Sequence, residues 1–311
     1  MQPFVEKNKI LEVVTGSRAY GFATDDSDTD IRGITIPPME YVIGLERFEQ
    51  QQYPGEDKVI YGLEKFMRLA ADCNPNIIEL IFMPMKHVLF MDKWGELLTQ
   101  NNMLFLSKKA RHTFSGYAFS QLHRIKGHKR WLDNPPSPPN PADYMTTRYF
   151  VLIERDDQRM PTRVGEEMYE KYDSSCRWVE TAVSDEYEIR EKDYKAYCKW
   201  RSERNPARAE LEEKYGYDCK HGTHLVRLLR MGVEILRDGV VIVDRVKAGD
   251  AEELWGIRNG AMKYEELIEY ASKIDADMNK LYEISKLPHS PDRKRINELY
   301  MEIVGGKLGI K

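Results

Sequence analysis

Two short motifs near the N-terminus carry residue types that suit phosphate and metal chemistry. Gly16-Ser17 follows an apolar run at 10–14, as a turn follows a buried strand. Gly16 lets the backbone approach a phosphate closely, and Ser17 adds a hydroxyl beside the amide groups of a following helix. Ten residues separate Ser17 from Asp28, and Asp30 follows. On one strand, alternation sends both carboxylates to the same face, about 7 Å apart, where they can share a hard cation such as Mg²⁺.

Together the two motifs favour nucleotidyl transfer, although each alone is common in turns and solvated loops. In that reaction a hydroxyl attacks the α-phosphorus of a nucleoside triphosphate (NTP) in line and displaces pyrophosphate, and two cations, Mg²⁺ or Mn²⁺, neutralise the charge. Two ions need a third carboxylate from a neighbouring strand. Asp57, just before an apolar pair at 59–60, stands where such a strand would begin. Glu56 and Glu64 are alternatives, and Asp57 could instead belong to a surface turn.

These motifs resemble the polymerase-β-type nucleotidyltransferase superfamily, whose pattern is Gly-Ser, a variable stretch of about this length and Asp-x-Asp. The closer resemblance is to the prokaryotic and phage nucleotidyltransferases that are associated with RNA ligases and proposed to act in RNA repair. The motifs that carry it are Gly16-Ser17-Arg18-Ala19-Tyr20-Gly21, Ser27-Asp28-x-Asp30-x-Arg32-Gly33, Tyr61-Gly62-Leu63-Glu64-Lys65-Phe66, Asn74-Pro75-Asn76 with Glu79-Leu80, and Lys220-His221-x-x-His224-Leu225-x-Arg227. Residues at about 133–214 match nothing in this pattern.

The resemblance implies an α+β fold, in which a polymerase-β-type domain with a mixed sheet flanked by helices precedes a mainly helical domain. It also implies an NTP substrate, an RNA end as the acceptor, and metal ligation by Asp28, Asp30 and, as the favoured third ligand, Asp57. Two other functions stay open. The acceptor could be a protein hydroxyl, or the chain could be a nucleic-acid-binding regulatory module on a transferase fold. Intact Gly-Ser and Asp-x-Asp motifs weigh against the module. Which NTP is used and the oligomeric state are not indicated.

Arginines near the motifs are candidates for phosphate contact. Arg18, with Ser17, would face the β- and γ-phosphates, because a guanidinium donates to two phosphate oxygens at once. Arg18 could instead pair with Asp25 or Asp26. Arg32 alternates onto the face of Asp28 and Asp30, where it would either orient those carboxylates or contact substrate.

A second row of cations lies on a helix predicted at 218–238. Lys220, His224 and Arg227 are spaced i, i+4 and i+7 and so share one stripe, which borders an apolar stripe of leucines. Cations beside a core are costly unless they serve an anion. We therefore expect them to bind the triphosphate across a cleft between two domains.

The segment from Leu97 to Leu132 is basic, with no Asp or Glu, in a chain whose net charge is −4. Its histidines and aromatic residues, Trp131 among them, could stack bases or could form the core of an amphipathic helix. The predicted nucleic-acid-binding residues are Lys108, Lys109, Arg111, Arg124 and Lys126.

Composition predicts a cytoplasmic globular protein, with 311 residues, 41% hydrophobic content and four cysteines that form no Cys-x-x-Cys pair. No apolar run approaches membrane-spanning length. The Pro-rich run at 134–141 predicts a domain boundary. We therefore expect a nucleotidyltransferase domain with a basic helical extension at 1–132, a linker at 133–143, and a mainly helical domain at 144–311.

The apolar patterns also predict individual elements. Strands are expected at 10–15, 29–36, 41–45, 58–61, 88–90 and 240–243. Helices are expected at 62–72, 76–82, 94–100, 106–132, 143–159, 166–174, 187–215, 218–238, 264–287 and 291–304, with Gly305-Gly306 ending the ordered packing.

Overall fold

The computed structural model describes residues 2–24, 27–148, 150–153, 160–163, 180–183, 185–204 and 206–309. The chain divides into two compact units, Met1–His128 with Glu210–Lys311, and Lys129–Ala209. This division differs from the predicted domains at 1–132 and 144–311. The reason is that helices after residue 210 share one apolar core with the N-terminal sheet, from Ile10 on the sheet to Val304 near the C-terminus.

A mixed five-stranded sheet, in the order β3-β4-β2-β1-β5, forms the centre of the first unit. β1 pairs antiparallel with β2 and β5, β2 pairs parallel with β4, and β4 pairs antiparallel with β3. This sheet with its helices confirms the predicted α+β fold. The strands are β1 (Lys9–Thr15), β2 (Asp30–Thr35), β3 (Gln50–Gln52), β4 (Lys58–Gly62) and β5 (Val88–Met91).

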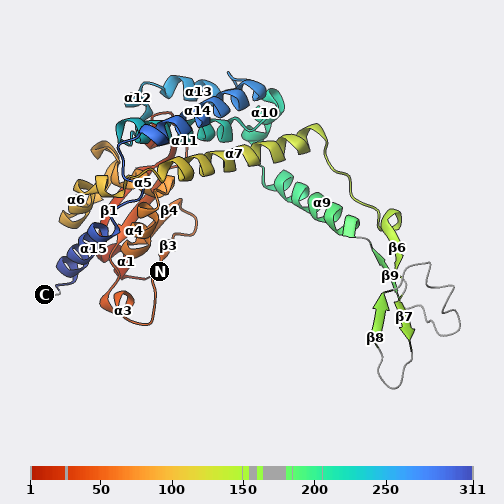
Figure 1. Ribbon diagram of the computed structural model, residues 1–311, viewed down its shortest axis with the longest axis horizontal. Coiled ribbons are helices and arrows are strands. Elements are labelled where there is room, and N and C mark those ends of the chain that lie inside the picture. The colour runs from red at the N-terminus through yellow and green to blue at the C-terminus, as the bar shows by residue number, and fades with distance from the viewer. Residues whose placement is uncertain are drawn as a thin grey trace. The chain divides into compact units, whose positions relative to one another are not determined.

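α4 and α6 lie against strands of this sheet (Figure 1), and their buried apolar residues belong to the same core as the sheet. α4 turns Leu63, Phe66 and Ala70 inward at helical spacing. α5 begins where Asn74 accepts a hydrogen bond from the Asn76 amide and a proline occupies the first turn. The helices are α1 (Phe4–Lys7), α2 (Gly16–Tyr20), α3 (Met39–Val42), α4 (Leu63–Ala71), α5 (Pro75–Ile81), α6 (Lys93–Gln100) and α7 (Ala110–Asp133), with short 3₁₀ turns at Met85–His87 and Asn102–Phe105.

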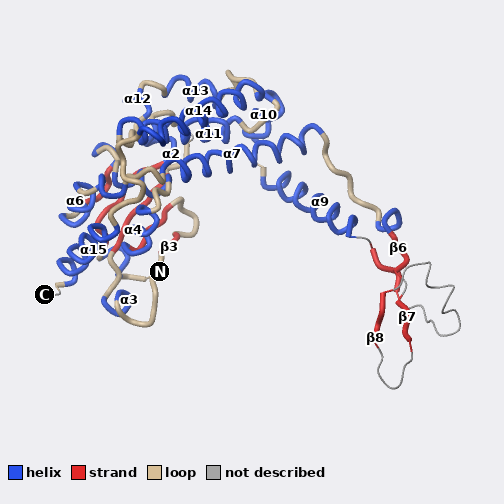
Figure 2. The backbone as a smooth tube through the Cα atoms, viewed as in Figure 1, coloured by secondary structure: helices blue, strands red, loops and turns tan. Residues whose placement is uncertain are grey.

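The helices after residue 205 include the long helix α11, which lies beside α13 and α14 (Figure 2). Asp218 caps its start by accepting the His221 amide, and Gly239, with φ of 67°, ends it. α11 packs against α13 and α14, and α15 packs against α4 and α6. These helices are α10 (Pro206–Tyr215), α11 (Cys219–Asp238), α12 (Arg245–Ala248), α13 (Ala251–Arg258), α14 (Tyr264–Ile284) and α15 (Arg293–Leu308).

Within its described residues, the second unit contains two strand pairs and the long helix α9. β6 pairs with β9, and β7 pairs with β8, both antiparallel. Its elements are a 3₁₀ turn at Pro141–Tyr144, β6 (Met145–Arg148), β7 (Phe150–Ile153), β8 (Met160–Arg163), β9 (Glu180–Val183) and α9 (Asp185–Glu203). Within the described parts of the chain, no helix is long and apolar enough to span a membrane.

Several predicted elements are wrong. Residues 41–45 do not form the predicted strand, because the first two belong to helix α3 and the rest to a turn. The edge strand β3 was not predicted. Strands β6 and β7 occupy part of the helix predicted at 143–159, and 240–243 has no strand. The helix predicted at 166–174 lies outside the described residues. Gly305-Gly306 does not end the packing, because α15 continues to Leu308 and a Cβ on Gly306 would lie 1.8 Å from the Trp94 ring.

Candidate active site

The Gly-Ser turn lies directly against the carboxylate of Asp30. Gly16 follows β1 and has a φ of 69°, the left-handed region that favours glycine. A Cβ at this position would stand 2.1 Å from Oδ2 of Asp30. The absence of a side chain at residue 16 therefore lets the turn and the carboxylate share one site.

Asp30 and Asp57 are brought together by parallel pairing of β2 with β4. Ile31 is in register with Lys58, so the residue before each lies at the same end of the sheet. The Ile31 amide donates to the Asp57 carbonyl at 2.8 Å. One nitrogen of Arg32, Nη2, lies 3.5 Å from Oδ1 of Asp30 and 3.7 Å from Oδ1 of Asp57. Arg32 therefore contacts both carboxylates, which suits the orienting role.

Asp28 lies in the loop before β2 and is exposed, because the strand begins at Asp30 and not at Asp28 as expected. The charge of Asp28 nevertheless affects the pKa of Asp30. Burial raises the pKa of Asp30, and the negative charges of Asp57 and Asp28 raise it further, against the opposing effects of Arg32 and Lys220. Carboxylates crowded enough to disfavour ionisation fit a divalent cation, whose charge would offset their repulsion. Asp28 and Asp57, two of the predicted metal ligands, thus both lie within electrostatic range of the third, Asp30.

Arg18 is held beside the turn by the backbone. Its Nη2 donates to the Ser27 carbonyl at 2.6 Å, and its Nε is buried without a hydrogen bond inside the described part of the chain. Asp25 and Asp26, the alternative partners, are outside the described residues. Ser17 stands next to Arg18 on α2, and its carbonyl accepts the amides of Gly21 and Phe22.

Of the predicted cationic row on α11, Lys220 lies near these carboxylates, and His224 lies near Lys220. Lys220 is exposed, and its charge lowers the pKa of Asp30. Burial lowers the pKa of His224 well below its ordinary value, and the nearby charges of Arg227, Lys220, His221 and Arg258 lower it further. Arg258, at the end of α13, is the cation of this group that the sequence patterns did not single out.

Arg227 occupies a different setting from the one expected. It is buried, its Nη1 donates to Oε1 of Glu79, and its guanidinium lies 3.9 Å from the centroid of the Tyr20 ring. The Tyr20 hydroxyl donates to Oε2 of Glu79 at 2.8 Å. Glu79 neutralises Arg227 inside one compact unit, where no cleft between units is involved. Glu79 and Tyr20 stand in family motifs, but nothing in their local sequence pairs them with residue 227.

The basic tract is divided between structural and exposed positions. Lys108 is buried with its Nζ 5.4 Å from the centroid of the Tyr282 ring, Lys109 pairs with Asp72 at 2.9 Å, and Arg111 pairs with Asp275 at 3.0 Å. Arg124 and Lys126 are exposed on α7. Those two are the predicted nucleic-acid contacts that remain at the surface of this helix.

The aromatic residue at the end of the tract packs within the second unit. The ring centroid of Trp131 lies 5.4 Å from that of Trp200 and 6.1 Å from that of Tyr197. Its indole nitrogen donates to Asp193 at 3.3 Å. These contacts join the end of α7 to α9.

A further group of possible metal ligands contains none of the predicted ones. Donor atoms of His128, Glu212 and Asp218 all lie within 4.8 Å of one another. Nε2 of His221 is 3.6 Å from Oδ2 of Asp218, and Nδ1 of His221 is 2.8 Å from Oε1 of Gln121. This polar group joins α7, α10 and the start of α11.

Comparison with known proteins gives a family for the N-terminal part. Residues 4–134 match the model of a family described as RlaP, RNA repair pathway DNA polymerase beta family, which confirms the resemblance seen in the motifs. A stretch of 74 residues is 34% identical to the uncharacterized protein YcgL of Bacillus subtilis (strain 168). That stretch covers 22% of this chain and 28% of the relative, so the chain spans little more than a quarter of the relative's length. No solved structure matches.

Proposed function

Because residues 4–134 match a polymerase-β family of RNA repair, we propose that the protein transfers a nucleoside monophosphate from an NTP to an acceptor hydroxyl and releases pyrophosphate. The observation that carries this proposal is the close approach of Gly16 to the Asp30 carboxylate, with Asp57 beside it just before the parallel strand β4. A phosphate-accommodating turn and a carboxylate pair are the two parts that such a reaction needs in one place.

Asp28, Asp30 and Asp57 would hold two Mg²⁺ or Mn²⁺ ions. When bound, these ions would lower the pKa of the attacking hydroxyl and neutralise charge on the leaving pyrophosphate. Arg32 would keep two of the carboxylates oriented through its contacts with Asp30 and Asp57.

The triphosphate would lie between the Gly-Ser turn and the start of α11. Ser17 and Arg18 would contact its outer phosphates on one side. Lys220 and Arg258 would supply positive charge on the other. Both lie close enough to act on His224, which would contact the phosphates as a neutral hydrogen-bond donor. Arg227 would support this arrangement indirectly, through its contacts with Glu79 and Tyr20, and would not touch the phosphates.

We propose an RNA end as the acceptor, supported by the family description and by the exposed Arg124 and Lys126. Phosphate contacts of this kind bind without sequence preference. A protein hydroxyl is the alternative acceptor, as in nucleotidylating relatives, and the same metal site would serve it.

The test is transfer of label from each α-³²P-NTP, with Mg²⁺ or Mn²⁺, to RNA, DNA or a cell lysate. Label on RNA that disappears in Asp30→Asn supports the proposal. Label on a lysate protein, with none on RNA, would select the protein acceptor. No transfer to any acceptor from any NTP would sink the enzyme proposal.

A further inference from the structure

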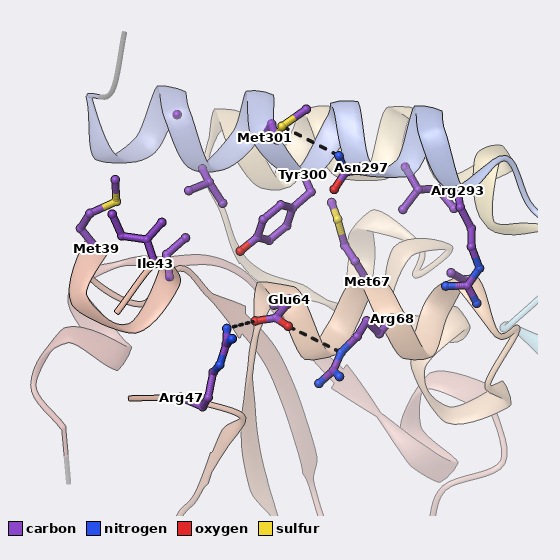
Figure 3. Close-up of a pocket in the computed structure, with 15 residues that line it drawn as sticks. Met39, Ile43, Arg47, Glu64, Met67, Arg68, Arg293, Asn297, Tyr300 and Met301 are labelled. Carbon is purple, nitrogen blue, oxygen red and sulfur yellow. Dashed lines mark hydrogen bonds and ion pairs between the residues drawn. The ribbon is translucent and has the colours of Figure 1, made fainter. Parts of the chain in front are cut away.

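A groove of about 630 Å³ lies between α3, α4 and α15, on the first unit (Figure 3). The residues that α15 contributes follow helical spacing, so they form one face of that helix: Arg293, Ile296, Asn297, Tyr300, Met301, Val304 and Gly305. α4 contributes one face in the same way: Glu64, Met67, Arg68 and Ala71. Met39, Val42 and Ile43 close the end formed by α3, and Arg47 follows them.

The groove is elongated. Its wall on α15 runs from Arg293 to Gly305, which at 1.5 Å per residue is about 18 Å. That length equals roughly three turns of a helix lying alongside. A round cavity for one compact ligand would not need so long a wall.

The lining is apolar and open to solvent. Ile43 is 74% exposed and Met301 is 56% exposed, and Leu45, two residues beyond Ile43, is fully exposed. Contiguous exposed apolar side chains of this kind mark interaction sites. Met39 and Met67 line the groove together with Met301, and unbranched methionine side chains adapt to the shape of a bound partner.

The groove is lined by three arginines and one carboxylate, so its charged lining residues are mainly cationic. Glu64 lies 3.6 Å from Arg47 and 3.9 Å from Arg68, so one carboxylate serves two guanidiniums. Asp72 is shared in the same way by Arg293, at 3.0 Å, and Lys109, at 2.9 Å. Each of these two carboxylates carries one negative charge beside two cations. The cations therefore form a rim with net positive charge, which suits an acidic ligand.

We propose that this groove binds an amphipathic helix of a partner protein, with apolar residues at i, i+4 and i+7 and acidic residues beside them. The length of the groove, its methionine-containing floor and its cationic rim are the features of helix-in-groove recognition. The groove goes beyond the proposed transfer reaction. Asp57 precedes β4, whereas α4 follows it, so the five residues of β4, about 16 Å of strand, separate Asp57 from Glu64.

The test uses two synthetic 16-residue helical peptides labelled with fluorescein. Both carry Leu at the same i, i+4, i+7 and i+11 positions, and the flanking positions carry Glu in one peptide and Lys in the other. Fluorescence anisotropy with the full chain should give at least 10-fold tighter binding of the Glu peptide. Met301→Asp should weaken that binding at least 10-fold. Met103→Asp, at an equally exposed methionine outside the groove, is the matched control and should leave it unchanged.

A charge-swapped variant keeps the test decisive if Met301→Asp disturbs the fold. Arg68→Glu with Arg293→Glu should lower the preference for the Glu peptide at least 10-fold. Equal binding of the two peptides by the wild type would overturn the proposal. A dimer that is seen by light scattering and that Met301→Asp dissociates would also overturn it. The same holds if single-stranded RNA displaces the Glu peptide from the groove. Each of these outcomes is independent of nucleotide transfer, so failure here would not bear on the proposed reaction.

Discussion

Arg227 and Tyr20 are in direct contact although they belong to opposite halves of the sequence, with the guanidinium stacked 3.9 Å from the ring centroid. Both side chains also contact Glu79, on α5. The Gly-Ser helix α2, the helix α5 and the long helix α11 are therefore joined by one buried charge and its partners.

We expect Arg227→Met to destabilise the fold by about 3–5 kcal/mol, because it leaves the carboxylate of Glu79 buried without its counter-charge. Urea unfolding monitored by circular dichroism would measure the change. Replacing both partners, Arg227→Met with Glu79→Leu, should recover most of the loss, since no charge then remains buried. If Arg227→Met unfolds like the wild type and only raises KM for the NTP, the residue grips the triphosphate instead.

Gly16→Ala should abolish nucleotide transfer, because the new methyl group would enter the Asp30 carboxylate, 2.1 Å away. Gly55→Ala is the matched control. Gly55 also has a positive φ, 83°, but nothing lies within 4 Å of a Cβ there. Both variants should lose about 1 kcal/mol of stability from the backbone conformation, while transfer should fail in Gly16→Ala alone. Equal activity of the two variants would show that the close approach at residue 16 does not matter.

Asp30→Asn should abolish transfer and leave the melting temperature without metal unchanged or higher. The substitution removes one of the like charges that raise the pKa of this carboxyl. Differential scanning fluorimetry should also show that NTP with Mg²⁺ stabilises the wild type and not the variant. Asp277→Asn, at a surface ion pair on α14, is the control. Normal turnover of Asp30→Asn would place the metal site elsewhere.

His224 should make the protein less stable as the pH falls. Its pKa in the folded state lies well below the ordinary value of 6.5, through burial and nearby cations. As the pH drops through 6.5, the unfolded chain takes up a proton there that the folded chain does not, so the free energy of unfolding decreases. His224→Asn should flatten this decrease between about pH 7 and pH 5, measured by urea unfolding. His123→Asn, at an exposed histidine on α7, should not change it. An unchanged slope in His224→Asn would contradict this account.

The parts of the site that are local in sequence were predictable. Gly16 follows the apolar strand β1, Asp57 precedes β4 and Asp30 begins β2, and apolar runs in the sequence mark these strands. α11 was predictable too, because its cap at Asp218 and its terminating Gly239 bracket a clear helical period.

The parts of the site that depend on contacts between residues far apart in the sequence could not be predicted. Arg227 and Glu79 are 148 residues apart, so only the folded chain shows that the charge is already balanced. The stretch around Tyr41 illustrates another limit. Short apolar runs suit a strand or a helical turn equally well, and the structure resolves this one as α3. Asp28 was assigned to a strand that begins two residues later, which is the usual error at element boundaries.

The buried Arg227–Glu79 pair also limits where the chain can be truncated without loss of stability. The family match ends at residue 134, which suggests a convenient fragment for expression. Such a fragment would keep Glu79 and Tyr20 but lose Arg227, and with α11 it would lose leucines of the apolar core that the two parts share. The fragment would be left with the buried carboxylate of Glu79 lacking its counter-charge and with an open core. The recognisable family segment is thus not a separable domain, and its integrity depends on a helix more than eighty residues further along the chain.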